Sequence, residues 1–286
     1  MGSGMENKKS FLKLSEIPIA PGIEIRIPTV GEILDDERTY YNIATLLTAT
    51  PSQCMAQLAE EGIDFSTISD WEFFKRQFIA IANQSRVLNL EIAKLKQCCE
   101  IFPPDTDEYL KAVAEIEKRE NTRQNIGLDF IFKDFSIDGF QILSENGDPD
   151  TILFNPETGT KIDKIVYANI AAQIRKINLF QYVKIKPGNE EAKRYLLEKE
   201  EKKRKRMAKR PYEPYLEKLV IALVNTSEFS YTYETCMDLS IYNFNQSLKQ
   251  IQNKVNYDNT MIGVYAGTIN ISKVGDKSAL SWIPIK

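Results

Sequence analysis

Apolar residues recur at three- and four-residue steps over most of this chain. That spacing puts them on one face of an α-helix, so most of the chain is expected to form helices that bury one side against a core. Shorter stretches alternate apolar and polar residues between turn residues, a pattern typical of half-buried strands. The sequence therefore predicts an α+β fold that is predominantly helical, with a few short antiparallel strands.

A mixed α+β unit is predicted over residues 11–186, and its strands lie in two places. Residues 11–28 hold two extended runs around the turn Pro21-Gly22. Residues 140–154 hold two more runs around a cluster of turn residues at 146–150. Turn residues between alternating runs favour hairpins, so each place is expected to form a small antiparallel sheet.

Helices fill the rest of this unit. One helix is expected to begin at Ser69-Asp70, and two more are expected over 85–101 and 106–125, separated by Pro103-Pro104. The first carries an aromatic stripe, and stripes at helical spacing usually face a core rather than a ligand. The members of the stripe are Trp71, Phe74, Phe78 and Ile81.

A charged helix and linker are predicted over residues 187–213. Between Asn189 and Arg210 the ten basic and five acidic residues give a charge of +5, so the rest of the chain carries −3 − 5 = −8. Glutamates one turn before the basic run favour a solvated connecting helix. Docking onto an acidic protein and binding of nucleic acid are the alternatives. The basic patch comprises Lys202, Lys203, Arg204, Lys205 and Arg206.

A small C-terminal helical domain with a terminal strand at 268–271 is predicted over residues 214–286. Within it, one narrow apolar stripe runs at strict 3-4-3-4 spacing, a pattern typical of a helix that packs on another helix. The same pattern describes a helix of the domain's own core, so both interpretations stay open. The stripe, a candidate partner-binding site, comprises Ile241, Phe244, Leu248, Ile251 and Val255.

The chain contains no histidine, and this excludes more chemistry than any other count. Ser-His-Asp and Cys-His catalysis, HExxH zinc sites and imidazole acid/base chemistry all require it. The phosphate-cradling and nucleophile-elbow motifs are also missing. The cysteines form no CxxC pair and are expected to be free, mostly buried thiols in a reducing compartment; they are Cys54, Cys98, Cys99 and Cys236. We expect no enzymatic activity, no cofactor and no metal.

Two acidic clusters are the best candidates for metal or nuclease chemistry. Asp148 and Asp150 precede Glu157 and Lys161, but the last two lie too far apart for the Glu-x-Lys of a PD-(D/E)xK nuclease. No glutamate closes the loop as an EF-hand requires. A solvated hairpin turn explains this cluster, and a helix start explains the other, at 35–37.

No apolar run approaches the roughly 20 residues of a membrane span. The net charge of −3 gives no overall attraction to nucleic acid or membranes. Residues 1–10 are expected to be an expression scar, Met1-Gly2-Ser3-Gly4 before Met5, and a flexible start. These features predict a soluble cytoplasmic protein.

Two stretches, 25–82 and 238–269, resemble proteins encoded among the tail genes of long-tailed phages of Gram-positive bacteria. The first contains Ile27-Pro-Thr-Val-Gly-Glu-Ile33 and GIDF at Gly62 to Phe65, and the second contains Tyr242, Phe244 and Gly263-Val-Tyr265. Such proteins are taken to be tail assembly chaperones, encoded just ahead of the tape measure.

The resemblance implies a binding role in the host cytoplasm, with the tape measure protein as partner and the tail tube protein as a further candidate. A homo-oligomer is also compatible with it. No catalytic residues carry over from these stretches. The alternatives are a structural component of the virion tail, such as a terminator or connector, and a nucleic-acid-binding protein that uses the basic helix.

Overall fold

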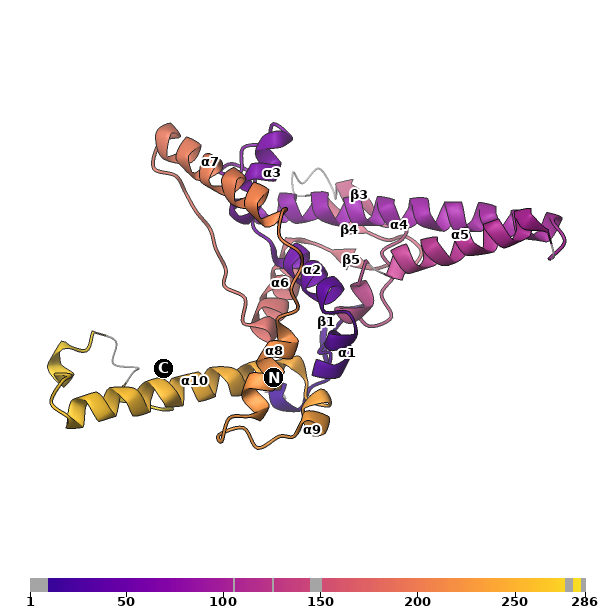
Figure 1. Cartoon of the computed structure of the whole chain (residues 1–286). Helices are drawn as coiled ribbons and strands as arrows, with labels where there is room; N and C mark the ends of the chain where they lie inside the picture. Colours follow the sequence, from indigo (N-terminus) through magenta and orange to yellow (C-terminus); the bar gives the residue numbers. More distant parts are fainter. Residues whose placement is uncertain (1–9, 105, 125, 145–150, 276–279, 284–286) are drawn as a thin grey trace, which may run out of the picture.

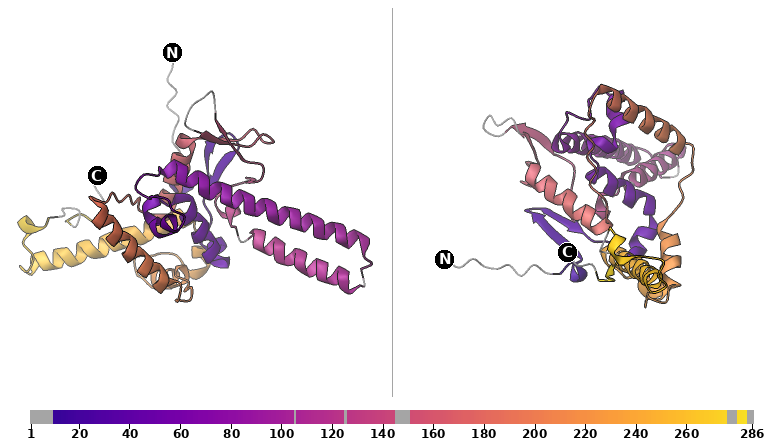
Figure 2. Two further views of the ribbon diagram at one scale, coloured as in Figure 1. Left: turned by 90° about the horizontal axis from the view of Figure 1, so that it is seen from above. Right: turned by 90° about the vertical axis from the view of Figure 1, so that its left-hand side faces the viewer.

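The computed structural model describes residues 10–104, 106–124, 126–144, 151–275 and 280–283 (Figure 1). Within these ranges it contains ten α-helices and two small antiparallel sheets. The predicted α+β, predominantly helical fold is confirmed. A pair of long helices projects from a central body on one side and a single long helix projects on the opposite side, which gives the molecule an extended outline (Figures 1 and 2).

The elements have the following bounds. The α-helices are α1 Val30–Asp35, α2 Glu37–Thr48, α3 Met55–Glu60, α4 Asp70–Ile101, α5 Asp107–Gln124, α6 Lys164–Asn178, α7 Glu190–Met207, α8 Leu216–Val224, α9 Tyr233–Met237 and α10 Ile241–Tyr265. The strands are β1 Glu16–Ala20, β2 Ile23–Arg26, β3 Gln141–Ser144, β4 Thr151–Phe154 and β5 Lys161–Ile162. The 3-10 helices are η1 Phe11–Lys13, η2 Pro51–Gln53, η3 Leu128–Phe130 and η4 Ile271–Lys273.

Both sheets form where the alternating pattern predicts them. Strands β1 and β2 form a hairpin that turns at Gly22, whose φ of 75° is accessible to glycine at no steric cost. The second sheet has the order β3-β4-β5 and is antiparallel throughout. Strand β3 is therefore an edge strand, with an exposed Ile142.

Helix α4 is longer than the sequence predicts. Separate helices were expected at Ser69-Asp70 and over 85–101, but α4 runs unbroken from Asp70 to Ile101. The expected start is correct, because Ser69 and Glu72 form a reciprocal capping box. The expected break is wrong, because residues 82–84 include no proline or glycine to interrupt the backbone hydrogen bonds.

The second half of α4 pairs with α5 as an antiparallel arm that extends from the body (Figures 1 and 2). Ile92 and Ala112 are buried between the two helices. Ion pairs flank this narrow contact: Arg119 lies 2.7 Å from Glu91, and Lys96 lies 3.2 Å from Glu120. Small apolar contacts and partly exposed ion pairs therefore hold the arm together.

One apolar core joins elements from both ends of the chain. The aromatic stripe of α4 faces this core as predicted, with Trp71, Phe74 and Phe78 all buried. Buried residues of α8 and α10, among them Leu216 and Phe244, belong to the same cluster. Packing is thus continuous across the charged segment 187–213, and the division of the chain into separate domains stays a prediction.

Backbone hydrogen bonds fasten the start of α10 to the start of α1. The Val30 amide donates to the Leu239 carbonyl at 2.8 Å, and the Ile241 amide donates to the Pro28 carbonyl at 2.8 Å. Gly31 permits this approach, because a Cβ there would lie 3.3 Å from the Met237 carbonyl oxygen. The two stretches that resemble phage tail proteins therefore meet in the fold.

A buried carboxylate makes a second connection between the ends of the chain. Glu37, which is only 6% exposed, accepts hydrogen bonds from the backbone amides of Tyr215 at 2.8 Å and Leu216 at 3.2 Å. These amides open α8 and have no partner within that helix. The sequence predicts only a helix-start role for the acidic cluster at 35–37, and Asp36 plays that role by capping α2.

The terminal strand predicted at 268–271 is wrong. Helix α10 continues to Tyr265, and Gly267, with a φ of 73°, ends it. The Thr268 amide donates to the Gly263 carbonyl and the Gly267 amide donates to the Val264 carbonyl, as in a Schellman motif. The following residues form η4, and no strand occurs among the described residues beyond 268.

Replacing Glu37 tests the connection to α8. Glu37→Ala should lower the free energy of unfolding by about 2 kcal/mol, because the two backbone amides that open α8 lose their acceptor. Glu37→Gln keeps an acceptor oxygen and should lose less. Glu217→Ala, at an exposed position in the first turn of α8, is the matched control and should cost well under about 1 kcal/mol. Urea denaturation measures all three, and equal losses for Glu37→Ala and Glu217→Ala would contradict the capping role.

Candidate partner-binding site

The first turns of α10 are part of the core rather than a docking surface. Ile241 and Phe244, the first two residues of the predicted stripe, are both 0% exposed. The Phe244 ring meets that of Phe229 edge-on, with 6.3 Å between centroids. In this conformation no partner can contact either residue of the stripe.

The same stripe becomes exposed as α10 leaves the body (Figure 1). Leu248 and Ile251 are half-buried against the core, and Val255 is 42% exposed. Continuing the seven-residue repeat beyond Val255 leads to Ile262 and Tyr265, which are 66% and 83% exposed. We call Val255, Ile262 and Tyr265 the distal seam.

The C-terminal segment returns along a different side of α10. The Gln250 side-chain amide donates to the Trp282 carbonyl at 2.6 Å. Ile269 packs so close to Gly263 that a Cβ there would lie 2.6 Å from its Cδ1 atom. Helical spacing at 100° per residue puts Gln250 well away from the direction of Val255 and Ile262. The returning segment therefore leaves the distal seam exposed.

One charged pair interrupts the apolar character of the distal seam. Asp258 occupies the seam position between Val255 and Ile262, and Lys254 lies 2.9 Å from its carboxylate. Lys254 also lies 3.4 Å from Glu228. The hydrogen bond to Asp258 and its negative charge, followed by Glu228, raise the pKa of Lys254 above its ordinary value. Lys254 therefore links two carboxylates, one of them within the seam.

Helix α7 docks on α3 through its inner face. Leu196 and Leu197 pack against a small cluster that is separate from the main core. This cluster comprises Ala49, Met55, Leu58, Phe65 and Phe73. Two ion pairs bracket the contact: Lys193 lies 2.7 Å from Asp64, and Arg204 pairs with Glu60. The sequence predicts a solvated helix, and acidic docking as an alternative; the acidic surface that α7 meets belongs to its own chain.

The rest of the predicted basic patch points into solvent. Lys202, Lys203 and Lys205 have side chains that are 80%, 59% and 70% exposed. Each forms an ion pair with a glutamate of its own helix, at distances of 3.8, 3.3 and 2.6 Å. Such exposed pairs at i,i+3 and i,i+4 spacing contribute little to stability.

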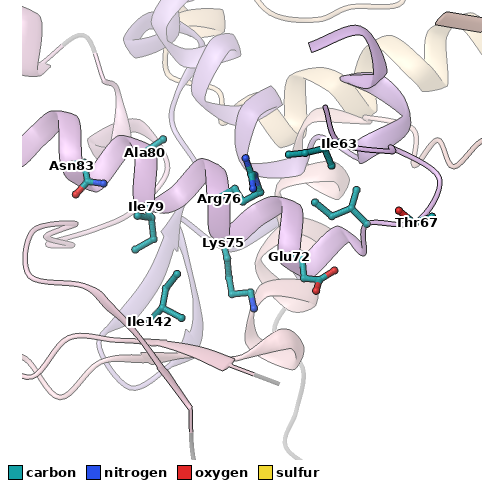
Figure 3. Close-up of a pocket in the computed structure, with 10 residues that line it drawn as sticks. Ile63, Thr67, Glu72, Lys75, Arg76, Ile79, Ala80, Asn83 and Ile142 are labelled. Atoms are coloured by element: carbon teal, nitrogen blue, oxygen red, sulfur yellow. The ribbon is translucent and has the colours of Figure 1, made fainter. Parts of the chain in front are cut away.

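A shallow pocket of about 740 Å³ lies beside the first half of α4 (Figure 3). Isoleucines of the α3–α4 loop, α4 and β3 form its apolar wall, among them Ile63, Ile79 and Ile142. Its charged residues serve the fold: Glu72 caps α4, and Arg76 lies 3.0 Å from Glu61. Lys75 also lines the pocket and donates to the Thr151 hydroxyl. The pocket offers room for an apolar side chain, and its charged groups already have partners in the fold.

The remaining chemical candidates form no site in the part of the chain that the structure describes. Asp148 and Asp150 lie outside the described residues. Glu157 belongs to a turn that the Asn155 side chain organises. No group of three or more histidine, cysteine, aspartate or glutamate side chains that could hold a metal occurs among the described residues. The four cysteines are free as predicted, although only Cys236 is fully buried.

Phe244 provides the first test of these assignments. Phe244→Ala removes a fully buried ring and should lower the free energy of unfolding by roughly 3–5 kcal/mol. Val255→Ala, on the exposed part of the same stripe, should change it by less than about 1 kcal/mol. Chemical denaturation followed by circular dichroism compares them, and a small loss for Phe244→Ala would show that the stripe is not anchored in the core.

The docking of α7 on α3 should weaken at acid pH. The hydrogen bond from Lys193, followed by that from the Ser66 amide, lowers the pKa of Asp64 to about 2. A depressed pKa means that the ion pair stabilises docking above about pH 4 and is lost as the pH falls towards 2. Hydrogen exchange of α7 amides should therefore be faster in Asp64→Asn than in the parent at pH 6, and the difference should vanish towards pH 2. A difference that persists there would contradict the assignment.

Comparison with known protein families matches the C-terminal part of the chain. Residues 202–285 match the family model of the YomV second domain, which covers less than half of the chain. None of the curated proteins and none of the solved structures matches. Within the described residues, no helix is both long and apolar enough to cross a membrane. The matched residues include the basic patch and all of α10, and the match suggests a phage-derived protein.

Proposed function

We propose that this protein is a non-enzymatic tail assembly chaperone of a long-tailed phage. Its partner is the tape measure protein, whose apolar helical stripes it covers in the host cytoplasm before the tail tube polymerises. The observation that carries the proposal is the distal seam. There the repeat that packs α10 into the body continues, exposed, through Val255, Ile262 and Tyr265.

The chemistry of the seam suits a helical partner. Residues at seven-residue spacing form a narrow line on a helix, and another apolar-striped helix covers such a line best. From Val255 to Tyr265 the seam extends for about 15 Å of helix. A contact of that length buries a modest area, so it can be released when tube subunits arrive.

A tape measure protein needs such cover during assembly. It is a long helical protein with apolar stripes, and exposed stripes aggregate before their final partners are present. The match to the YomV second domain supports a phage origin but says nothing of this partner. The tail tube protein is a further candidate partner, and the structural component of the virion tail is the competing role.

Glutamate substitutions in the distal seam test the proposal directly. Val255→Glu/Ile262→Glu should reduce capture of co-expressed tape measure protein at least tenfold, because two charges would be buried in an apolar contact. The variant should stay folded, since both side chains are exposed. Pull-down from co-expressing cells measures capture, and the soluble fraction of the tape measure protein measures the chaperone effect.

Ile165→Glu/Leu90→Glu is the matched control, with two exposed apolar residues on other helices, 72% and 56% exposed. It should bind like the parent. Equal loss in both double variants would place the binding surface elsewhere. Mass spectrometry of purified phage particles distinguishes the chaperone from a structural tail component. A chaperone should be missing from the particles, whereas a tail component should be present in a fixed ratio.

A further inference from the structure

The outer face of α7 carries a line of cations that the proposed chaperone role does not use. Lys199, Lys202 and Arg206 follow one another at steps of three and four residues, so they lie along one side of the helix. Tyr195 opens the same line and is 65% exposed. We call these four residues the basic face, and a shallow surface hollow is lined by all of them.

The inward cations of α7 differ from those of the basic face in their partners. Lys193 and Arg204 point inward and pair with acidic residues at and after α3. No carboxylate among the described residues lies within ion-pair distance of Lys199 or Arg206. The Lys202 ammonium is 3.8 Å from Glu198, at the long end of an ion pair. Docking of α7 thus leaves the positive charge of the basic face available.

The composition of this face favours a polyanion over a protein partner. Protein interfaces are usually held by a buried apolar core. The basic face offers one aromatic ring and otherwise charged side chains. A phosphate backbone needs no apolar core, because its affinity comes from the cations and the counterions they release. Phosphates can also displace exposed glutamates such as Glu198, whose ion pairs contribute little.

The tyrosine favours single strands. An exposed aromatic ring in line with cations can stack on an unpaired base, whereas the bases of a duplex are already stacked. From Tyr195 to Arg206 the face extends for about 16 Å. We infer that the basic face of α7 binds the phosphate backbone of single-stranded nucleic acid, with Tyr195 stacking on a base. This site is separate from the distal seam of α10, so either proposal can fail alone.

Fluorescence anisotropy with a labelled oligothymidine of roughly 20 nucleotides tests the inference on the full chain. Lys199→Gln/Lys202→Gln/Arg206→Gln should weaken binding at least tenfold at about 50 mM salt, and the slope of log affinity against log salt should become shallower by about 2. The control Lys94→Gln/Lys111→Gln/Lys118→Gln removes the same charge from exposed positions on α4 and α5 and should bind like the parent.

Tyr195→Ala separates stacking from charge. It should weaken binding of the single strand several-fold and leave binding of a duplex of the same length unchanged. No binding by the parent at about 50 mM salt, or equal losses in the two triple variants, would overturn the inference. Salt-sensitive binding of a polyglutamate peptide without binding of the oligonucleotide would overturn it too and would assign the face to an acidic protein.

Discussion

Burial of the first turns of α10 is the constraint on which the outline of the molecule depends. Ile241 and Phe244 fill the core, and the Ile241 amide is held by the Pro28 carbonyl. Most of the stability of a helix in a protein comes from packing of its apolar face, and α10 fully buries residues only in its first turns. Anchoring at one end and a Schellman motif at the other allow its remaining turns to project with little cover. The distal seam exists because the near end of the same stripe is fixed.

Helix α7 is attached in a different way. None of its residues is fully buried, and two leucines with two ion pairs hold it on α3. Local stability follows the number of buried apolar contacts. The free energy needed to detach α7 from α3 should therefore be much lower than the free energy needed to pull α10 out of the core. Salt screens exposed ion pairs, which makes this docking sensitive to ionic strength. The two helices therefore differ in how firmly the body positions them.

Local patterns in the sequence predicted most of the helices and strands, but not the contacts that these elements make with distant parts of the chain. The hairpins and the capping box at Ser69 were predictable because their signals lie within a few residues of each other. The carboxylate of Glu37 caps a helix that begins 179 residues later in the chain, and no local pattern indicates such a partner. The terminal strand failed for a related reason: a short alternating run at 268–271 cannot reveal that a Schellman motif turns it back along α10.

The stripe of α10 shows the same limit at the candidate site. Its spacing was correct over the whole length, yet spacing cannot distinguish the turns that face the core from those that face solvent. The packed structure shows that the stripe changes from buried to exposed between Phe244 and Val255.

The charged pair of Asp258 and Lys254 within the distal seam constrains any helix that covers the seam. Burying the Asp258 carboxylate and the Lys254 ammonium without further partners would cost more than their mutual attraction returns. A covering helix must therefore leave this pair at the solvated edge or place a polar side chain opposite it. Either solution fixes the register of the contact, as a single polar residue does in a coiled coil. A seam that was apolar throughout would allow a partner helix to slide by one heptad, whereas this one favours a single alignment.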